Sequence, residues 1–314
     1  MDLRPHPEQL RGAGRFFTTG IPAICAAYLG IVLAMHDLRP EHVLAVVLAL
    51  VLSLWSDSSR RLARVGLPYV LYAAVYDSMR WYEDYIRSPI IHVREPYEFD
   101  LRLFGIHGMT PNEWLQRHTH AALDLVCGLA YTPFFFIGES VILSLYLGFS
   151  GRLKIGERFT WAFVIANFIG FTCYYIYPAA PPWYVADHGF LVDLTVRASP
   201  AGAIRFDHLI GFPLMEGFYG KSADVFGAIP SLHVVYPFLA MNYGWRLRRF
   251  RPFAIGYFLL VCFSAVYLNH HYLLDIFVGL GIAVTVMAGA RALFGALYPE
   301  PEATLAMADE PLRT

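Results

Sequence analysis

Two histidine-containing segments in the last third of the chain carry the residues most suited to chemistry. One is Phe226–His233 and the other is Asn269–Asp275. Histidine titrates near neutral pH and can act as nucleophile, acid or base. His271 and Asp275 are four residues apart, so on a helix they share a face, where the carboxylate can fix the imidazole tautomer and stabilise its cation. The pattern predicts one joint site built from His233, His271 and Asp275.

The residues around His233 favour a helix start that binds an anion. Pro230 suits the first position of a helix, and the turn after it would expose backbone N–H groups. Asp275 is expected one turn inside a membrane span, where an unpaired carboxylate is costly, so we interpret it as functional. Phosphoryl transfer fits best, because one histidine can attack phosphorus while the other protonates the departing oxygen. Two unconnected interfacial histidines are the alternative.

The composition places these residues in a polytopic membrane protein. The 314-residue chain is 57% hydrophobic and 16% charged, with a mean hydropathy of +0.45. An average soluble domain carries roughly 25% charged residues. The net charge of −1 lacks the basic excess of a nucleic-acid-binding protein. All four cysteines fall in apolar runs and indicate neither a disulfide framework nor a metal site.

Apolar segments of about 20 residues must position the two histidine segments, so the expected fold is all-α. Basic residues accumulate in alternate connections, which predicts that both chain ends are cytoplasmic. The connections 83–121 and 178–229 then lie on the extracytoplasmic face, together with His233 and His271. The eight predicted spans lie near residues 16–35, 41–56, 65–82, 122–149, 159–177, 230–246, 252–269 and 271–295.

The two histidine segments resemble the second and third signature motifs of the type 2 phosphatidic acid phosphatase superfamily. With Tyr177–Tyr184 and Ser199–Gly202, they are most similar to its inositol phosphorylceramide synthase (aureobasidin-resistance) branch. The resemblance covers about 100–295 and implies a six-helix core that needs no metal or other cofactor. Where phosphatases carry Ser-Arg, the chain has Ser264 and Ala265, so the arginine is absent, and it also lacks their Lys-x6-Arg-Pro motif.

The resemblance implies a role for each residue of the joint site. His271 is the nucleophile that carries an inositol phosphate intermediate, and Asp275 orients it. His233 protonates the leaving group and then acts as base on the acceptor. The implied donor is phosphatidylinositol, the acceptor is a ceramide-like lipid, and diacylglycerol leaves. Two alternatives stay open, a lipid phosphate phosphatase with water as acceptor and a non-catalytic lipid transporter.

The predicted spans and the resemblance also predict how the chain divides into segments and which membrane contains it. Residues 1–60 are expected to form a cytoplasmic start with two added helices, residues 61–298 the six-helix catalytic core, and residues 299–314 a short acidic tail. The compact chain and short tail favour a bacterial inner membrane, with a Golgi membrane and a lumenal site as the alternative. The partners expected are the bilayer and the two lipids, and no nucleic acid.

Seven further residues are predicted to bind the phosphate or the lipid: Asp124, Trp183, Tyr184, Arg205, Lys221, Ser231 and His270. Arg205 and Lys221 are the nearest basic residues that could replace the missing phosphatase motifs, and ion pairs with acidic neighbours in the same connection are the alternative. Trp183 and Tyr184 either anchor the chain at the membrane interface or shape the lipid pocket. Asp124 lies near the outer end of its span and could face the site.

Overall fold

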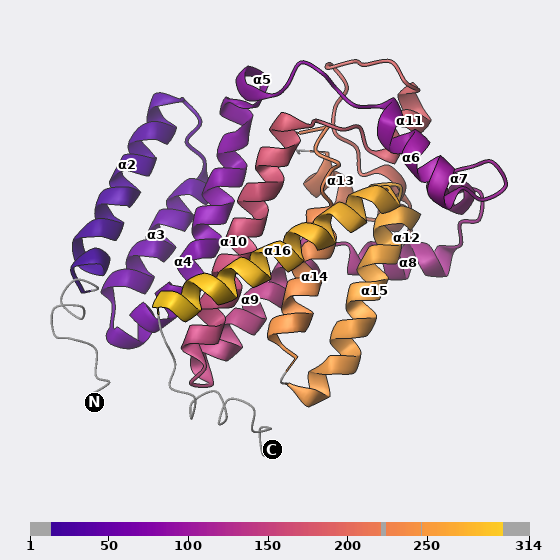
Figure 1. Ribbon diagram of the computed structural model, residues 1–314. Helices are drawn as coiled ribbons and strands as arrows, with labels where there is room; N and C mark the ends of the chain where they lie inside the picture. The colour runs from indigo at the N-terminus through magenta and orange to yellow at the C-terminus, as the bar shows by residue number, and fades with distance from the viewer. Residues whose placement is uncertain (1–13, 221–223, 246, 298–314) are drawn as a thin grey trace. The chain divides into compact units, whose positions relative to one another are not determined.

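The computed structural model describes residues 14–220, 224–245 and 247–297 (Figure 1). These residues form helices joined by turns, and no strand occurs among them. The all-α expectation is therefore confirmed. Lys221 and the predicted acidic tail, 299–314, lie outside the described residues.

The chain divides into two compact units, and the first holds the residues up to Trp81 together with Ser144–Thr160. Its core joins the first two long helices through Ile21, Cys25, Val46 and Ala49. Its elements are a π-helical turn η1 (Phe16–Gly20), α2 (Ile21–Ala34), α3 (Pro40–Leu54), α4 (Asp57–Ser78) and a 3-10 turn η2 (Met79–Trp81).

The helices of the first unit match the predicted spans unequally. The continuous helix Phe16–Ala34 agrees with the first span. The 15-residue α3 is shorter than the roughly 20 residues that cross a bilayer. The helix α4 begins before the predicted residue 65, because Ser56 caps it: its Oγ accepts the Ser59 N–H at 3.0 Å, and the Ser59 Oγ accepts the Ser56 N–H at 2.8 Å.

The second unit holds Tyr82–Leu143 and the residues from Trp161 onward. Its outer connections are not bare loops, since short helices fold within them. Two long helices, α9 (Pro133–Phe149) and α10 (Leu153–Ile176), have residues in both units. The other elements are α5 (Glu83–Ile86), α6 (Arg94–Phe104), α7 (Pro111–Gln116), α8 (Ala121–Ala130), α11 (Pro182–His188), η3 (Ala201–Ala203), α12 (Ile204–Ile210), α13 (Leu214–Tyr219), α14 (Leu232–Tyr243), η4 (Arg248–Phe250), α15 (Arg251–Tyr267) and α16 (Leu273–Leu297).

The predicted span 122–149 is interrupted in the structure. The helix stops at Ala130, and α9 starts afresh at Pro133. Proline has no N–H to donate, and it disfavours the helical conformation of the residue before it. The interruption leaves Tyr131 and Thr132 between two helices, which frees the Tyr131 carbonyl and ring for contacts with other elements.

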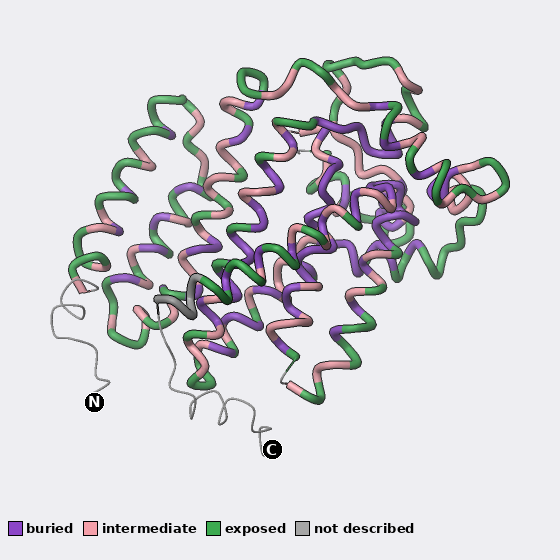
Figure 2. Tube along the Cα trace, in the orientation of Figure 1, coloured by how far each residue is buried: buried purple, intermediate pink, exposed green. Residues whose placement is uncertain are grey.

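The two helices that carry the histidine segments also begin later than predicted. Ser231 is the N-cap of α14, so Pro230 precedes the helix and is not its first residue. The helix α15 ends at Tyr267, and Asn269 adopts a left-handed conformation with a φ of 63°. As a result His271 lies in the turn before α16. The helix α14 packs against both α15 and α16, and buried residues concentrate around this turn and the start of α14 (Figure 2).

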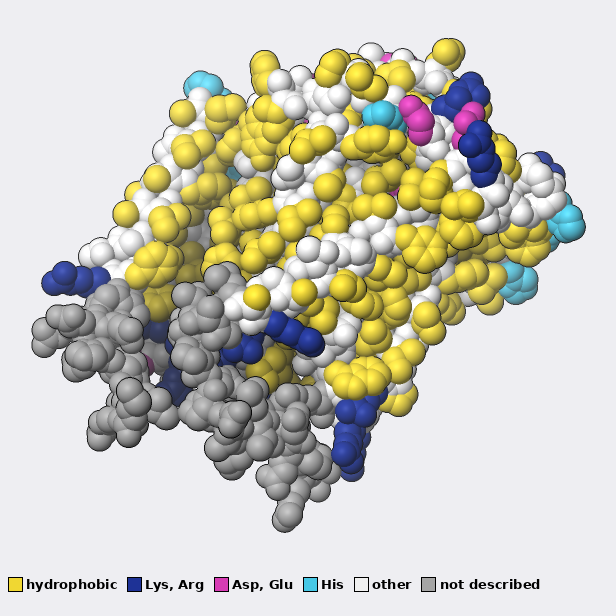
Figure 3. Space-filling view, viewed as in Figure 1, with side chains coloured by type: hydrophobic (Ala, Val, Ile, Leu, Met, Phe, Trp, Pro, Cys, Tyr) yellow, Lys and Arg dark blue, Asp and Glu magenta, His cyan; other side chains and the backbone are white. Residues whose placement is uncertain are grey.

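Five helices of the described chain are long and apolar enough to cross a membrane, so the count of eight spans is not confirmed. Among the predicted spans that fall short, α3 and α14 are too short, with 15 and 12 residues. Large apolar side chains such as Phe253 and Phe277 are exposed on α15 and α16, and hydrophobic side chains cover most of the face in Figure 3. These surfaces fit an integral membrane protein. The five spans are Phe16–Ala34, Ala121–Phe149, Leu153–Ile176, Arg248–Tyr267 and Leu273–Ala292.

Candidate active site

The turn between α15 and α16 presents His271 with a defined tautomer. Its Nδ1 lies 3.0 Å from the carbonyl oxygen of Ala228 and 3.2 Å from the Oδ2 of Asp275. Both partners accept hydrogen bonds, so Nδ1 must carry the hydrogen and Nε2 keeps its lone pair in the neutral ring. Asp275 in turn accepts the backbone N–H of Tyr272 at 2.9 Å. The predicted pair of His271 and Asp275 is in contact, although only Asp275 belongs to the helix.

The two histidine segments meet in space. His233 is the second residue of α14, and its Nδ1 lies 3.1 Å from the Nε2 of His271. His271 is 4% exposed and Asp275 is fully buried, whereas His233 keeps partial exposure. The arrangement joins Asp275, the His271 imidazole and a second imidazole in one row, and these are the side-chain types that group transfer through histidine uses.

Aromatic residues from two other elements enclose His233. The ring of Tyr131 stacks on it with centroids 4.5 Å apart, and Phe136 of α9 meets it edge-on at 5.0 Å. The hydroxyl of Tyr219, at the end of α13, lies 3.3 Å from the Nε2 of His233 and donates to the Tyr131 carbonyl at 3.0 Å. Sequence reasoning missed all three aromatic residues. The one available signal was Pro133, which marks the helix break at Tyr131.

Burial controls the charge of the two histidines in the turn. It lowers the pKa of His271 to about 4, against the opposing effect of the Ala228 carbonyl. It also lowers the pKa of His270 to about 3, with a further contribution from the neighbouring His271. Both rings are therefore neutral at pH 7, and His271 is in its nucleophilic form.

Three polar side chains from α6 and α7 hold this turn in place. Asp100 accepts the backbone N–H groups of Leu273 and Leu274, at 2.8 and 3.0 Å. The amide of Asn112 donates to the carbonyls of Val266 and His271, both at 3.0 Å. Gln116 donates to the Tyr267 carbonyl at 2.7 Å. We call Asp100, Asn112 and Gln116 the clamp residues.

The clamp residues were not predicted from the sequence. They lie about 150 residues or more from the groups they bond, in a connection that is polar throughout. Burial raises the pKa of Asp100 to about 6, while its bonds to the two N–H groups oppose that shift.

Arg205 and Asp124, which were predicted separately, form an ion pair. The Arg205 Nε donates to the Asp124 Oδ1 at 2.6 Å, and its Nη1 donates to Gln116 at 2.9 Å. Tyr267 also donates to this Asp124 oxygen, at 2.8 Å. Among the described residues, the salt bridge of Arg205 is with Asp124 of α8 and not with an acidic neighbour in its own connection. Its Nη2 is buried without a hydrogen-bond partner among the described residues.

Two more predicted residues present buried polar atoms without a partner. The hydroxyl of Ser231 and the Nε2 of His270 have no hydrogen-bond partner in the described part of the chain. The backbone N–H of Ser231 donates to the Asp275 carbonyl at 2.9 Å, which ties the start of α14 to α16. These orphaned donors and acceptors, with the Arg205 Nη2, are suited to an incoming polar ligand.

Trp183 and Tyr184 are buried, so the interfacial-anchor interpretation is wrong. They are 6% and 0% exposed and pack in a cluster with Phe226. The backbone N–H of Trp183 donates to the carbonyl of Asn269 at 3.1 Å. The pair therefore supports the turn that carries His271, and direct contact with a lipid stays a prediction.

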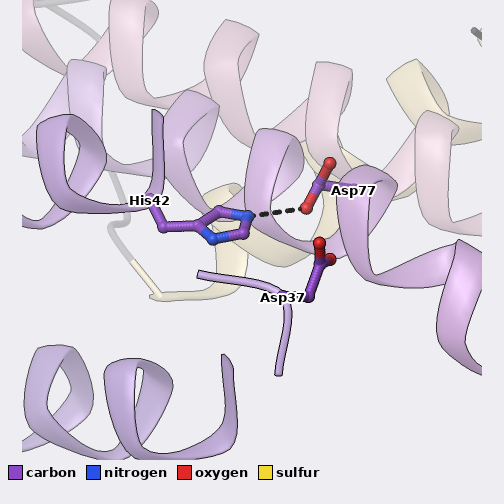
Figure 4. Close-up of side chains that lie close together, drawn as sticks. All are labelled: Asp37, His42 and Asp77. Carbon is purple, nitrogen blue, oxygen red and sulfur yellow. Dashed lines mark hydrogen bonds and ion pairs between the residues drawn. The ribbon is translucent and has the colours of Figure 1, made fainter. Parts of the chain in front are cut away.

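A separate cluster in the first unit has ligand-type side chains but does not fit a metal ion. Asp37, His42 and Asp77 converge there (Figure 4). The Nδ1 of His42 accepts the Arg39 N–H at 3.2 Å, and its Nε2 lies 2.9 Å from Asp77. Arg39 is also bonded to Asp77 and Asp37. The guanidinium already supplies the cation, so the cluster is an ion-pair network that joins the α2–α3 turn to the end of α4.

Comparison with known proteins adds a family assignment. The profile of the PAP2 superfamily matches residues 97–289. The chain is 34% identical over 275 residues to a phosphoinositol dihydroceramide synthase of Bacteroides thetaiotaomicron, covering 85% of this chain and 89% of that protein. It is 28% identical over 255 residues to an inositol phosphorylceramide synthase catalytic subunit of Schizosaccharomyces pombe, covering 80% of this chain and 58% of that one. No solved structure matches the chain significantly.

Proposed function

The chain belongs to the PAP2 superfamily, and on this premise we propose that it transfers inositol phosphate from phosphatidylinositol to a ceramide-type lipid hydroxyl. The observation that carries the proposal is the row formed by His233, His271 and Asp275, in which the Nε2 of His271 keeps its lone pair 3.1 Å from the second imidazole. The two synthase relatives support the substrate class, because their names specify inositol phosphate transfer to ceramide-type lipids.

In the first step, the Nε2 of His271 attacks the phosphorus of phosphatidylinositol. An N–P bond forms, and the bond between phosphorus and the diacylglycerol oxygen breaks. His233 gives its Nδ1 proton to that oxygen, so neutral diacylglycerol leaves. Burial and the neighbouring His271 and His270 lower the pKa of His233, so the anionic phosphodiester must draw the proton onto this ring when it binds. Asp275 stabilises the cationic phosphohistidine ring through the Nδ1 hydrogen.

In the second step, His233 acts as a base. It takes the proton of the acceptor hydroxyl, whose oxygen attacks phosphorus while the N–P bond breaks. His271 returns to its neutral form and His233 is protonated again, so the cycle balances. The Tyr219 hydroxyl faces the other nitrogen of His233 and keeps the ring oriented in both steps.

The substrate must separate the two histidines. A reacting phosphorus lies about 3 Å from its nucleophile, with the departing oxygen on the opposite side. The present separation of 3.1 Å between the ring nitrogens leaves no space for a phosphoryl group. Two groups would receive its oxygens, namely the Arg205 Nη2 and the Ser231 hydroxyl, each buried without a partner among the described residues. The Nε2 of neutral His270 can only accept, so it would bind a hydroxyl of the substrate.

The phosphatase alternative has less support. At the two positions where phosphatases carry Ser-Arg, this chain has Ser264, whose hydroxyl donates to Leu260 of its own helix at 2.7 Å, and the fully buried Ala265. Neither side chain offers a guanidinium for a terminal phosphate. The proposed location is an inner membrane with the site on the extracytoplasmic face, in keeping with the bacterial relative.

The test is transfer by the purified chain in detergent or vesicles. With labelled phosphatidylinositol and ceramide, we expect a labelled inositol phosphoryl lipid and free diacylglycerol. His271→Ala and His233→Ala abolish the product, and acid-labile label is trapped on the wild-type protein. Absence of product from the wild type, or activity in His271→Ala, refutes the proposal. Inorganic phosphate released from phosphatidic acid supports the phosphatase, and lipid movement unaffected by both variants supports a transporter.

A further inference from the structure

A carboxyl group in α9 has no hydrogen-bond partner among the residues that the structure describes. Both carboxyl oxygens of Glu139 are buried, and neither has a hydrogen-bond partner among the described residues. An ionisable group in a bilayer without a partner is costly, and such groups mark functional sites by default. The residue as a whole keeps partial exposure, so a lipid can approach it from the bilayer.

Glu139 lies one turn beyond a residue of the candidate active site. Phe136 is three residues earlier, so the two side chains share a face of α9. The ring of Phe136 contacts His233 edge-on and stacks with Tyr236, both on α14, with centroids 5.0 and 5.6 Å apart. The carboxyl group also interacts electrostatically with Tyr257 of α15. Glu139 is therefore directed toward α14 and α15, about 5 Å further along α9 than the contact with His233.

The nearby hydroxyl groups do not satisfy Glu139. Tyr257 donates its hydrogen to the Ala130 carbonyl at 3.0 Å. Ser140, the next residue of α9, donates to the Phe136 carbonyl at 3.4 Å. The carboxyl oxygens thus remain acceptors beside the region where the acceptor hydroxyl must meet His233.

We propose that Glu139 selects the acceptor lipid by accepting hydrogen bonds from its amide N–H and adjacent secondary hydroxyl. This inference rests on the proposed function. In a ceramide-type lipid these donors lie one and two carbons from the carbon that bears the reacting hydroxyl. When the reacting hydroxyl lies at His233, the amide N–H and the secondary hydroxyl come within reach of the Glu139 carboxyl group, about one helical turn away. A glycerolipid donor carries ester oxygens there, which only accept, so a carboxyl group distinguishes the two lipids.

The experiment compares acceptors in vesicles that contain the full chain. The acceptors are a ceramide, its N-methyl analogue and its 3-deoxy analogue. We expect Glu139→Leu to raise the acceptor KM about tenfold, because the two hydrogen bonds that it removes contribute about 0.7 kcal/mol each. Glu139→Gln, whose single amide oxygen accepts one of the two hydrogen bonds, raises the acceptor KM about threefold. Wild type discriminates against both analogues, and Glu139→Leu treats all three acceptors alike.

The donor step separates recognition from a structural role. Diacylglycerol release in a single turnover without acceptor keeps its wild-type rate in Glu139→Leu, and Ser140→Ala, the adjacent control, behaves as wild type in both steps. An unchanged acceptor KM in Glu139→Leu overturns the inference, as does an equal loss in both steps.

A separate binding measurement distinguishes failure of the inference from failure of the proposed function. If the wild type transfers nothing to ceramide, cross-linking of a photoactivatable ceramide is measured in His271→Ala with and without Glu139→Leu. A cross-linking yield reduced about tenfold by Glu139→Leu supports the recognition site. Equal yields overturn it.

Discussion

Substitution of Asp100 by Asn tests whether the clamp residues position the nucleophile. Asp100 accepts the N–H groups of Leu273 and Leu274 at 2.8 and 3.0 Å and is fully buried. An Asn has one acceptor oxygen in place of two, and its NH2 group would face the second N–H. One charge-assisted hydrogen bond is lost at the start of α16, which costs about 2 kcal/mol. Because this turn carries His271, we expect the lost hydrogen bond to move the His271 ring away from the position that it needs for attack on phosphorus.

That free energy sets the expected rate. If all of it is spent on restoring the reactive position of His271, kcat falls about 30-fold, because each 1.36 kcal/mol is a factor of ten. The acceptor KM is expected to stay within about twofold, since Asp100 contacts backbone groups and no lipid. Steady-state kinetics and the single-turnover rate of phosphohistidine formation measure both quantities.

The matched control removes a helix cap elsewhere. Ser56→Ala deletes the N-cap of α4 in the first unit and is expected to lower stability by about 1 kcal/mol. It should leave kcat unchanged. The positioning argument is refuted if Asp100→Asn retains wild-type kcat in well-folded protein, or if Ser56→Ala lowers kcat as much at an equal shift in Tm.

Three further perturbations have defined outcomes. Tyr219→Phe removes the hydroxyl 3.3 Å from the Nε2 of His233, and steady-state assays should show kcat reduced about tenfold with donor KM unchanged; wild-type kcat would exclude an orienting role. Because the pKa of His271 is about 4, about 90% of this ring is neutral at pH 5, against about 3% for an ordinary histidine. In Asp100→Asn, which lacks the carboxyl group with a pKa of about 6, single-turnover phosphohistidine formation should therefore not decline between pH 7 and 5. A decline with a midpoint near 6.5 contradicts the lowered pKa. Gly202→Ala places a Cβ 2.9 Å from both the Nη1 of Arg205 and the carbonyl oxygen of Leu268, so it should lower kcat through the turn before His271 and raise the donor KM at least about fivefold through the displaced guanidinium. An unchanged donor KM would show that Arg205 does not hold the phosphate.

Short-range hydrophobic patterns were sufficient to predict several helices. The first span and the helices α15 and α16 follow from apolar runs of about 20 residues, since a bilayer imposes that length. Helix ends were less predictable. Asn269, in the left-handed conformation, displaced His271 from the expected helix into a turn. The apolar run through residues 122–149 concealed the break that Pro133 imposes.

The sequence by itself determined which three side chains were expected to form one site. Two histidines and an aspartate at defined spacings predicted one joint site, and the structure brings His233, His271 and Asp275 into contact. The prediction used the spacing of residues along the chain and the distribution of basic residues between connections, because both can be read from short segments.

Only the tertiary structure decided which polar groups support the chemistry. Asp100 and Asn112 reach the catalytic turn across more than 150 residues of chain, and Arg205 is bonded to Asp124 instead of an acidic neighbour in its own connection. A hydrogen bond depends on which atoms face each other within about 3 Å. Sequence order does not specify that for residues on different helices, so packing of α6, α7 and α12 against the core selected these partners.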